Sequence, residues 1–449
     1  MNSSAPFPPS LPDIDLPPEP PDPSAARDAT APLWLCLFSV AGYCLQFGAN
    51  LLLARALRYR EFDDYNVAAA TVAMLATLAT LGLEKSSLQF LPGYQNLGQW
   101  PLAKGFLLFS RRLVVLVSLA LAILTAICLE SVLVLMNAGY HPAIPAAIAF
   151  LPFIALTLLW IESAAALGRQ LAAVAAYRVL LPLCLVLLNG IVFLVVGELS
   201  AMAAVVVLGI SWMTALLVLG RLLESRLHKL APVDVVPQFD RANWAASSLP
   251  LLVQSLMLTV HGQAGVIVLE LLYPNLPVVS QFAMAMYTGT LIIIVATATN
   301  RFYLSRAASL RARQDAPALR RLRRSRAWMM GGFAAVYLFA IVVFGRSILG
   351  WFGAEYVESY LTLIVIAIGA AVSVQFSTAP FNLQFQGRHG LVLIATASST
   401  VFGVAASAVL GTYLGEIGVA IAYAVSTAGL FLLLGWAAGR QLRLTSAGV

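Results

Sequence analysis

Long apolar stretches alternate with short polar segments along almost the whole chain, from residue 33 to residue 440. A helix needs about twenty predominantly apolar residues to cross the hydrocarbon core of a bilayer. The pattern contains twelve stretches of roughly that length, and it therefore predicts an all-α polytopic membrane protein. The predicted spans are residues 33–54, 67–90, 106–129, 143–168, 173–197, 201–222, 244–271, 278–303, 327–350, 357–380, 390–413 and 418–439.

A polar segment at residues 223–243 divides the twelve spans into six and six. Because six is even, both halves enter the membrane in the same direction, and any internal repeat is parallel, with its pseudo-twofold axis along the membrane normal. We therefore expect two six-helix bundles, residues 33–222 and 244–440, joined by a linker at 223–243. Residues 1–32 hold ten prolines and five acids, which is typical of a disordered tail, and residues 441–449 form a second, short tail.

Basic residues are distributed unevenly between the two sides of the predicted membrane. The segment 301–326 holds nine arginines and one acid, Asp315, and short segments of this kind stay on the cytoplasmic side. With that segment inside, 22 of the 27 basic residues are cytoplasmic, four are external and one, Lys85, lies within a span. This predicts cytoplasmic chain ends. The alternative that the basic segment binds nucleic acid is weaker, because topology already requires its charge.

The composition excludes a soluble globule. The chain is 60% hydrophobic and 10% charged, whereas soluble domains carry about 25% charged residues. The four cysteines lie in apolar runs without CxxC pairing, which predicts neither a disulfide framework nor a metal site. No phosphate-binding loop or zinc motif is present, so we expect no enzyme and no cofactor.

Charged groups inside spans cost about 2.5–3.5 kcal/mol on insertion scales, so each exception needs a reason. The exceptions here are Glu84, Lys85, Glu162 and the titratable His261. One interpretation is functional: Lys85 binds a lipid phosphate, while Glu84, Glu162 or His261 binds a coupling ion. The other is structural: Lys85 forms an ion pair with Glu84 or Glu162.

Polar side chains also form a stripe on the first helix of each half. Tyr43, Gln46 and Asn50 share one helix face, and so do Ser247, Gln254 and His261. Two such stripes favour a water-filled cleft between the bundles, with hydrogen bonding between helices as the alternative. The candidate substrate-binding residues are Lys85, Tyr43, Gln46, Asn50 and Gln254.

Several short segments carry a family resemblance. They are Glu61-Phe62-Asp63-Asp64-Tyr65, Leu81-Gly82-Leu83-Glu84-Lys85, Phe352-Gly353-Ala354-Glu355-Tyr356, and the segment 415–423. Together with the twelve spans, the chain resembles the bacterial polysaccharide (O-antigen type) flippases of the multidrug/oligosaccharidyl-lipid/polysaccharide exporter superfamily. One departure is that the acid often found midway through the seventh span of these relatives is replaced by His261-Gly262-Gln263.

The resemblance implies two bundles facing each other in a V around a central cavity, in the bacterial inner membrane. It implies movement of an undecaprenyl-diphosphate-linked glycan between leaflets by alternating access, with a proton or sodium counter-ion. Its partners would be membrane lipids and a glycan polymerase or export machinery. The alternatives are a cation-coupled multidrug exporter of the same superfamily, a membrane-embedded glycan polymerase or ligase, and a channel.

Overall fold

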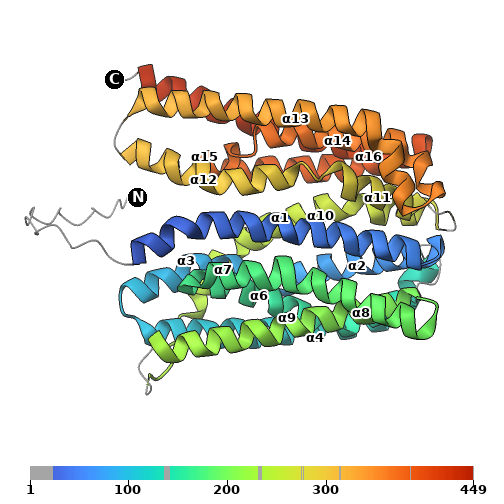
Figure 1. Cartoon of the computed structure of the whole chain (residues 1–449). Helices are drawn as coiled ribbons and strands as arrows, with labels where there is room; N and C mark the ends of the chain where they lie inside the picture. Colours follow the sequence, from blue (N-terminus) through green and yellow to red (C-terminus); the bar gives the residue numbers. More distant parts are fainter. Residues whose placement is uncertain are drawn as a thin grey trace, which may run out of the picture.

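The computed structural model describes residues 24–135, 142–230, 235–274, 276, 278–312, 315–384 and 386–447, and these are almost entirely helical (Figure 1). The first bundle contains α1 (Ser24–Ala56), α2 (Tyr59–Ala79), α3 (Leu83–Asn96), α4 (Trp100–Leu135), α5 (Ala143–Ala149), α6 (Leu151–Ala164), η1 (Ala165–Arg169), α7 (Gln170–Ala175), η2 (Ala176–Leu180), α8 (Leu181–Val196) and α9 (Ala201–Leu230). The second contains α10 (Arg241–Leu272), α11 (Val278–Gly289), α12 (Ile293–Ala312), α13 (Ala316–Phe352), η3 (Ala354–Ser359), α14 (Tyr360–Gln375), α15 (Ala379–Gln384) and α16 (His389–Ala447).

The helices account for the twelve predicted spans. Eight stretches of the described chain are long and apolar enough to cross a membrane, but Leu151–Val196 and His389–Arg440 are 46 and 52 residues long. Each of these is a helical hairpin, with the chain turning at Gly168 in one and at Gly415 in the other. Counting α2–α3, which bend by 43° at their break, as one span, and the consecutive helices α11 and α12 as another, then gives twelve. The predicted fold class, two six-helix bundles, is confirmed.

The long helix α16 contains two spans, because the chain turns back at Gly415. Gly415 has φ +59°, a left-handed conformation that glycine adopts without steric penalty, and the helix reverses direction there. The Ser399 hydroxyl donates to the carbonyl of Ser426 at 2.8 Å, so the two arms of α16 lie side by side. The arms are the eleventh and twelfth spans.

Several helices extend beyond the predicted span ends. α1 begins at Ser24, nine residues before the predicted start, and the rest of the predicted tail, residues 1–23, lies outside the described residues. α9 runs to Leu230 and α10 begins at Arg241, which shortens the connection between the bundles. The C-terminal segment after residue 440 continues α16 as far as Ala447.

The basic segment 301–326 is mostly helix rather than loop. α12 runs to Ala312 and α13 begins at Ala316, where the carboxylate of Asp315 accepts a hydrogen bond from the Ala318 backbone N–H at 2.9 Å. Arginine is a good helix former, so two helices can project past the membrane surface before they turn. Figure 1 shows this turn at the same end of the molecule as the start of α1 and the end of α16.

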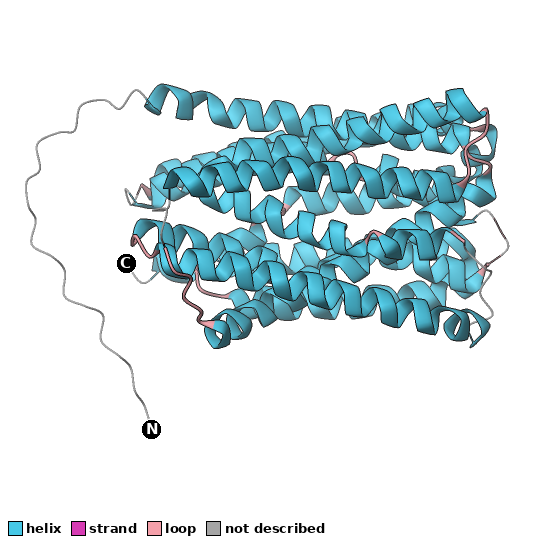
Figure 2. Cartoon of the chain, turned by 90° about the horizontal axis from the view of Figure 1, so that it is seen from below, coloured by secondary structure: helices cyan, strands magenta, loops and turns pink. Residues whose placement is uncertain are grey.

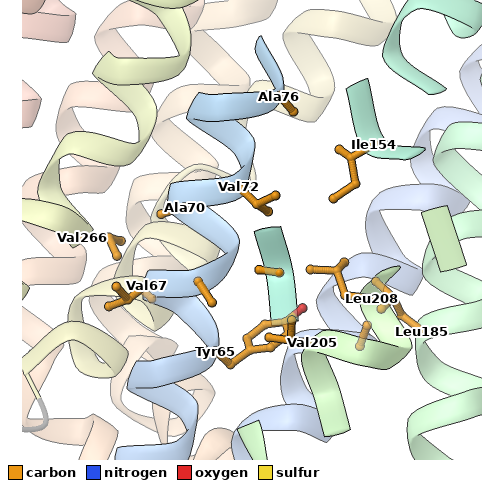
Figure 3. Packing of buried hydrophobic residues seen from close by; sticks show 14 of the residues in the cluster. Tyr65, Val67, Ala70, Val72, Ala76, Ile154, Leu185, Val205, Leu208 and Val266 are labelled. Atoms are coloured by element: carbon orange, nitrogen blue, oxygen red, sulfur yellow. The ribbon is translucent and has the colours of Figure 1, made fainter. Parts of the chain in front are cut away.

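The two bundles lie side by side with their helices roughly parallel (Figures 1 and 2). They meet where α2 and α3 pack along α10, and where α2 packs against α11. In Figure 3, α2 runs through the core with Val266 of α10 on one side and Ile154, Leu185 and Leu208 on the other. α1, α2 and α3 therefore all contact the second bundle, and α2 does so along both α10 and α11.

Candidate functional site

A cavity of about 340 Å³ lies where the two bundles meet. Its walls come from α1, α2, α6, η2, α8 and α9 of the first bundle and from α10 and α11 of the second. Several apolar wall residues, among them Val72, Ile154 and Leu208, appear in Figure 3. The full lining is Gly42, Gln46, Asn50, Tyr65, Ala69, Val72, Ala73, Ala76, Thr77, Ile154, Leu158, Tyr177, Arg178, Leu181, Pro182, Leu185, Leu208, Trp212, Thr259, Gln263 and Tyr287.

The polar stripe predicted on the first helix faces this cavity. Gln46 and Asn50 both line it, and the Gln46 side-chain amide donates to Oδ1 of Asn50 at 3.3 Å. Tyr43, one turn earlier on α1, lies against Arg178 of η2, with 4.5 Å from the guanidinium carbon to the ring centroid. All three predicted residues of α1 therefore lie in or beside one polar site.

Arg178 is the charged residue that sequence reasoning missed. It lies only five residues after the start of the predicted span 173–197, and the charge count therefore includes it among the 22 basic residues at the cytoplasmic side. In the structure it lines the cavity, and its guanidinium also lies 4.9 Å from the ring centroid of Tyr177. The sequence does hold a signal for this position: Tyr177 is adjacent to Arg178, Tyr43 belongs to the polar stripe, and arginine stacks readily on aromatic faces.

The stripe predicted on α10 faces elsewhere. Gln254 and His261 are not among the cavity-lining residues, and α10 contributes Thr259 and Gln263 from another face. The Nε2 atom of His261 lies 2.8 Å from the Thr427 hydroxyl, inside the second bundle. A spacing of seven residues identifies a shared face but not the neighbour that the face contacts, and for His261 that neighbour is α16.

A second cavity, large enough for about one water, lies beside His261. Its volume is about 10 Å³, and its polar lining includes Thr400, Ser407 and Ser426. The His261 ring also packs near Tyr423, with 5.5 Å between ring centroids. This small polar chamber is contained within the second bundle.

The charged residues predicted in spans two and four meet inside the first bundle. The Lys85 ammonium forms an ion pair with the carboxylate of Glu162. The neighbouring Glu84 is buried instead, and its Oε1 accepts a hydrogen bond from the Ser255 hydroxyl of α10 at 3.1 Å. Neither Lys85 nor Glu162 lines the central cavity. Their ion pair is the contact that the structural interpretation of Lys85 requires.

Polar side chains connect the bundles along their whole contact. The hydroxyls of Thr77 and Thr259 lie 3.1 Å apart beside the cavity. Near the start of α2, the Tyr287 hydroxyl donates to Asn66 at 3.0 Å. Near the end of α3, the Trp244 indole donates to the Tyr94 hydroxyl at 2.9 Å. We call this set of contacts, from Asn66–Tyr287 to Tyr94–Trp244, the seam.

No family model and no curated protein matches this sequence. Solved structures do match over nearly the whole chain. An inward-facing multidrug resistance MATE family transporter of the MOP (multidrug/oligosaccharidyl-lipid/polysaccharide) superfamily aligns with TM-score 0.66 at 15% identity, covering 90% of this chain and 94% of its own. A mutant of the Vibrio cholerae MATE transporter VcmN aligns with TM-score 0.62 at 13% identity, covering 92% and 98%.

A third match is a MOP superfamily transporter from Pyrococcus furiosus, described as having a binding pocket of reverse polarity that suggests a different function. It aligns with TM-score 0.61 at 15% identity and covers 93% of this chain and 96% of its own. At these identities the likeness is one of fold. The chain has the twelve-helix MATE transporter fold.

Proposed function

We propose that this protein is an alternating-access exporter that carries an amphipathic anion across a membrane. The observation that carries the proposal is the central cavity, whose walls come from both bundles. A site shared between two bodies changes its access when the bodies move relative to each other, which is how transporters built from repeats operate. A cavity enclosed by one bundle would not have this property.

The seam supports such a motion. Its contacts are hydrogen bonds between hydroxyl, amide and indole groups, including Thr77–Thr259 and Asn66–Tyr287. Asn66, Thr77 and Trp244 are buried in this state, but water can enter between the bundles as they part and replace the lost partners, which keeps the net cost of breaking each hydrogen bond small. The bundles can therefore separate at one end of the seam while the other end stays closed.

The charge of the cavity favours an anion. Arg178 is the charged residue among its described lining side chains, and no carboxylate faces it there. A site for cationic drugs would use acids and aromatic rings, whereas a phosphate site uses arginine or lysine. Together with the resemblance of the sequence to polysaccharide flippases, this favours a lipid-linked diphosphate glycan moved between leaflets of the bacterial inner membrane.

Multidrug export is the second candidate, and a specific observation favours it. A structure that superimposes on this chain belongs to a multidrug resistance transporter, and the cavity has the tyrosine and tryptophan rings that stack on organic cations. The two candidates differ in the sign of the substrate charge. That difference makes them separable by experiment.

A coupling ion belongs to the same proposal. His261 faces the water-sized chamber of the second bundle, and Glu84 is a buried carboxylate on the seam. Groups whose protonation differs between the two facings can couple transport to a proton gradient. We assign this role to His261, Glu84 and Glu162 as candidates, with sodium as the alternative ion.

Transport into proteoliposomes tests the proposal. The full chain is reconstituted, and the movement of a fluorescent polyprenyl diphosphate lipid between leaflets is compared with uptake of tetraphenylphosphonium, a lipophilic cation. We expect the anion to move and the cation not to. A double variant, Thr77→Cys with Thr259→Cys in a background without native cysteines, should stop transport on oxidation and recover with reductant. Cation uptake alone would establish the drug exporter instead.

A further inference from the structure

The most unusual group in the central cavity is the guanidinium of Arg178. It belongs to η2, a π-helical turn between α7 and α8, and such turns are rare and frequent at functional sites. The side chain is half-buried among the lining residues of the cavity. Within the described chain no carboxylate or other hydrogen-bond acceptor is paired with it, which is uncommon for an arginine within a predicted span.

The guanidinium carbon lies over two tyrosine rings. It is 4.5 Å from the ring centroid of Tyr43 and 4.9 Å from that of Tyr177. Stacking uses the flat face of the guanidinium and leaves the N–H donors at its edge for an in-plane acceptor. A close backbone approach fixes the position further, because Gly42 of α1 lies directly against the carbonyl of Arg178.

We infer that Arg178 is the binding site for the phosphate or diphosphate group of the substrate. The guanidinium edge matches two oxygens of a phosphate in a bidentate hydrogen bond. No acid on the described lining competes for it, and the amides of Gln46, Asn50 and Gln263 line the same cavity as further donors. This inference rests on the proposed function, since it names the part of the substrate that the cavity recognises.

The size of the cavity limits what accompanies the phosphate. Its volume of about 340 Å³ lies at the small end of the ~300–1,000 Å³ range typical of ligand sites. It accommodates a phosphorylated head with little attached, and a long glycan must extend out of it. The apolar residues Leu158, Leu181 and Leu185 on the same wall suit the first carbons of a lipid chain. Arg178 therefore selects the charged group that all members of such a substrate class share.

Equilibrium binding to the full chain in lipid nanodiscs tests the inference, with undecaprenyl diphosphate and soluble inorganic pyrophosphate as probes. Arg178→Gln should weaken binding of the lipid about 10- to 100-fold, which is the range expected for a charge-assisted hydrogen bond. Arg178→Lys keeps the positive charge but loses the paired N–H donors of the guanidinium, so its affinity for the lipid should lie between those of the unmodified protein and Arg178→Gln. Binding of pyrophosphate as well as the lipid would identify free phosphate compounds as ligands, whereas binding of the lipid alone would identify a lipid headgroup.

The matched control is Arg346→Gln. Arg346 is also stacked on a tyrosine, Tyr360, at 4.9 Å, but it is exposed on α13 outside the cavity, so its variant should bind like the unmodified protein. A second variant leaves Arg178 intact. Gln46→Glu adds the carboxylate that the cavity lacks, and it should abolish anion binding and create binding of tetraphenylphosphonium.

Unchanged anion affinity in Arg178→Gln overturns the inference. If Arg178→Gln does not fold, Gln46→Glu replaces it in the test, and unchanged anion affinity in Gln46→Glu then overturns the inference. Failure of the proposed function looks different. In that case the unmodified protein does not transport the lipid diphosphate, whether or not Arg178 binds it. Normal transport together with Arg178-independent binding would retain the function and reject the site.

Discussion

The carboxylate of Asp63 on α2 accepts a hydrogen bond from the backbone N–H of Ser280 on α11, with 2.5 Å between oxygen and nitrogen. Ser280 is the third residue of α11, so its N–H is one of the donors that a helix leaves without an internal partner. Asp63 is buried, with only 6% of the residue exposed. A residue of the first bundle thus caps a helix of the second, at the end of the molecule opposite the basic segment.

This cap predicts that Asp63 holds one end of the transporter closed. A charged cap contributes about 0.5–2 kcal/mol, and a tenfold change in population needs about 1.4 kcal/mol. Asp63→Ala should therefore open that end several-fold more often. A cysteine placed at Ala69, which lines the cavity, should then react faster with an impermeant thiol reagent in intact cells.

Glu198→Gln is the control for the cap. Glu198 pairs with Arg58 at 3.8 Å, but both side chains are 84% exposed, so removing this acid should leave the labelling rate unchanged. Equal labelling rates in Asp63→Ala and the unmodified protein would show that the cap does not govern opening.

Gly82 should not tolerate a side chain, because it lies directly against the backbone of α10. A Cβ there would lie 2.3 Å from the carbonyl oxygen of Ser248 and 2.5 Å from the nitrogen of Leu252, both backbone atoms of α10. Gly82→Ala should therefore force α3 away from α10 and lower the melting temperature or block transport.

Gly98→Ala provides the comparison, because Gly98 has a similar left-handed φ of +67° but open space around its Cα. Its variant should carry only the conformational penalty of about 1 kcal/mol. Similar thermal stability and transport in the two variants would mean that the close approach at Gly82 is unimportant.

The ion pair between Lys85 and Glu162 predicts a compensating double mutant. If the pair is structural, Lys85→Met should lower protein yield or thermal stability by leaving Glu162 without its cation, and adding Glu162→Gln should restore it. If Lys85 binds phosphate, Lys85→Met should be stable but inactive, and the second change should not rescue it. Full activity from a stable Lys85→Met protein would remove Lys85 from the substrate site.

The chamber beside His261 predicts where proton coupling can be lost. His261 is the group in this chamber whose ordinary titration lies closest to neutrality. His261→Asn keeps a hydrogen-bonding side chain for Thr427 but cannot titrate, so it should abolish the pH dependence of transport in vesicles while leaving the fold intact. Glu162→Gln is measured beside it, and unchanged pH dependence in both would exclude these two residues.

The orientation of the chain predicts a labelling pattern. Cysteines placed singly at Pro274 and Gly353, at the end of the molecule where α10 and α13 finish, should react with an impermeant thiol reagent in intact cells. A cysteine at Ala316, in the turn between α12 and α13, should not react. Reaction at Ala316 alone would invert the membrane orientation.

The order of the spans and their division into two bundles follow from sequence alone. Apolar length is a local property, and bilayer thickness converts it directly into a count of helices. The same reasoning placed Tyr43, Gln46 and Asn50 on one face of α1, because helical spacing requires no knowledge of neighbours. The turn at Gly415 did not affect the count, since the polar residues around it already separated two apolar runs.

Tertiary structure alone decided which side chains meet. The face of α10 that carries Gln254 and His261 is as polar as the face that carries Thr259 and Gln263, and only the packing of α16 and α2 determines which one lines the central cavity. The charge count of the sequence does not distinguish Arg178 from the other basic residues, whereas in the structure its guanidinium lies over the rings of Tyr43 and Tyr177 and lines the cavity. The contact with Tyr43 joins residues more than a hundred positions apart, which a local pattern does not encode.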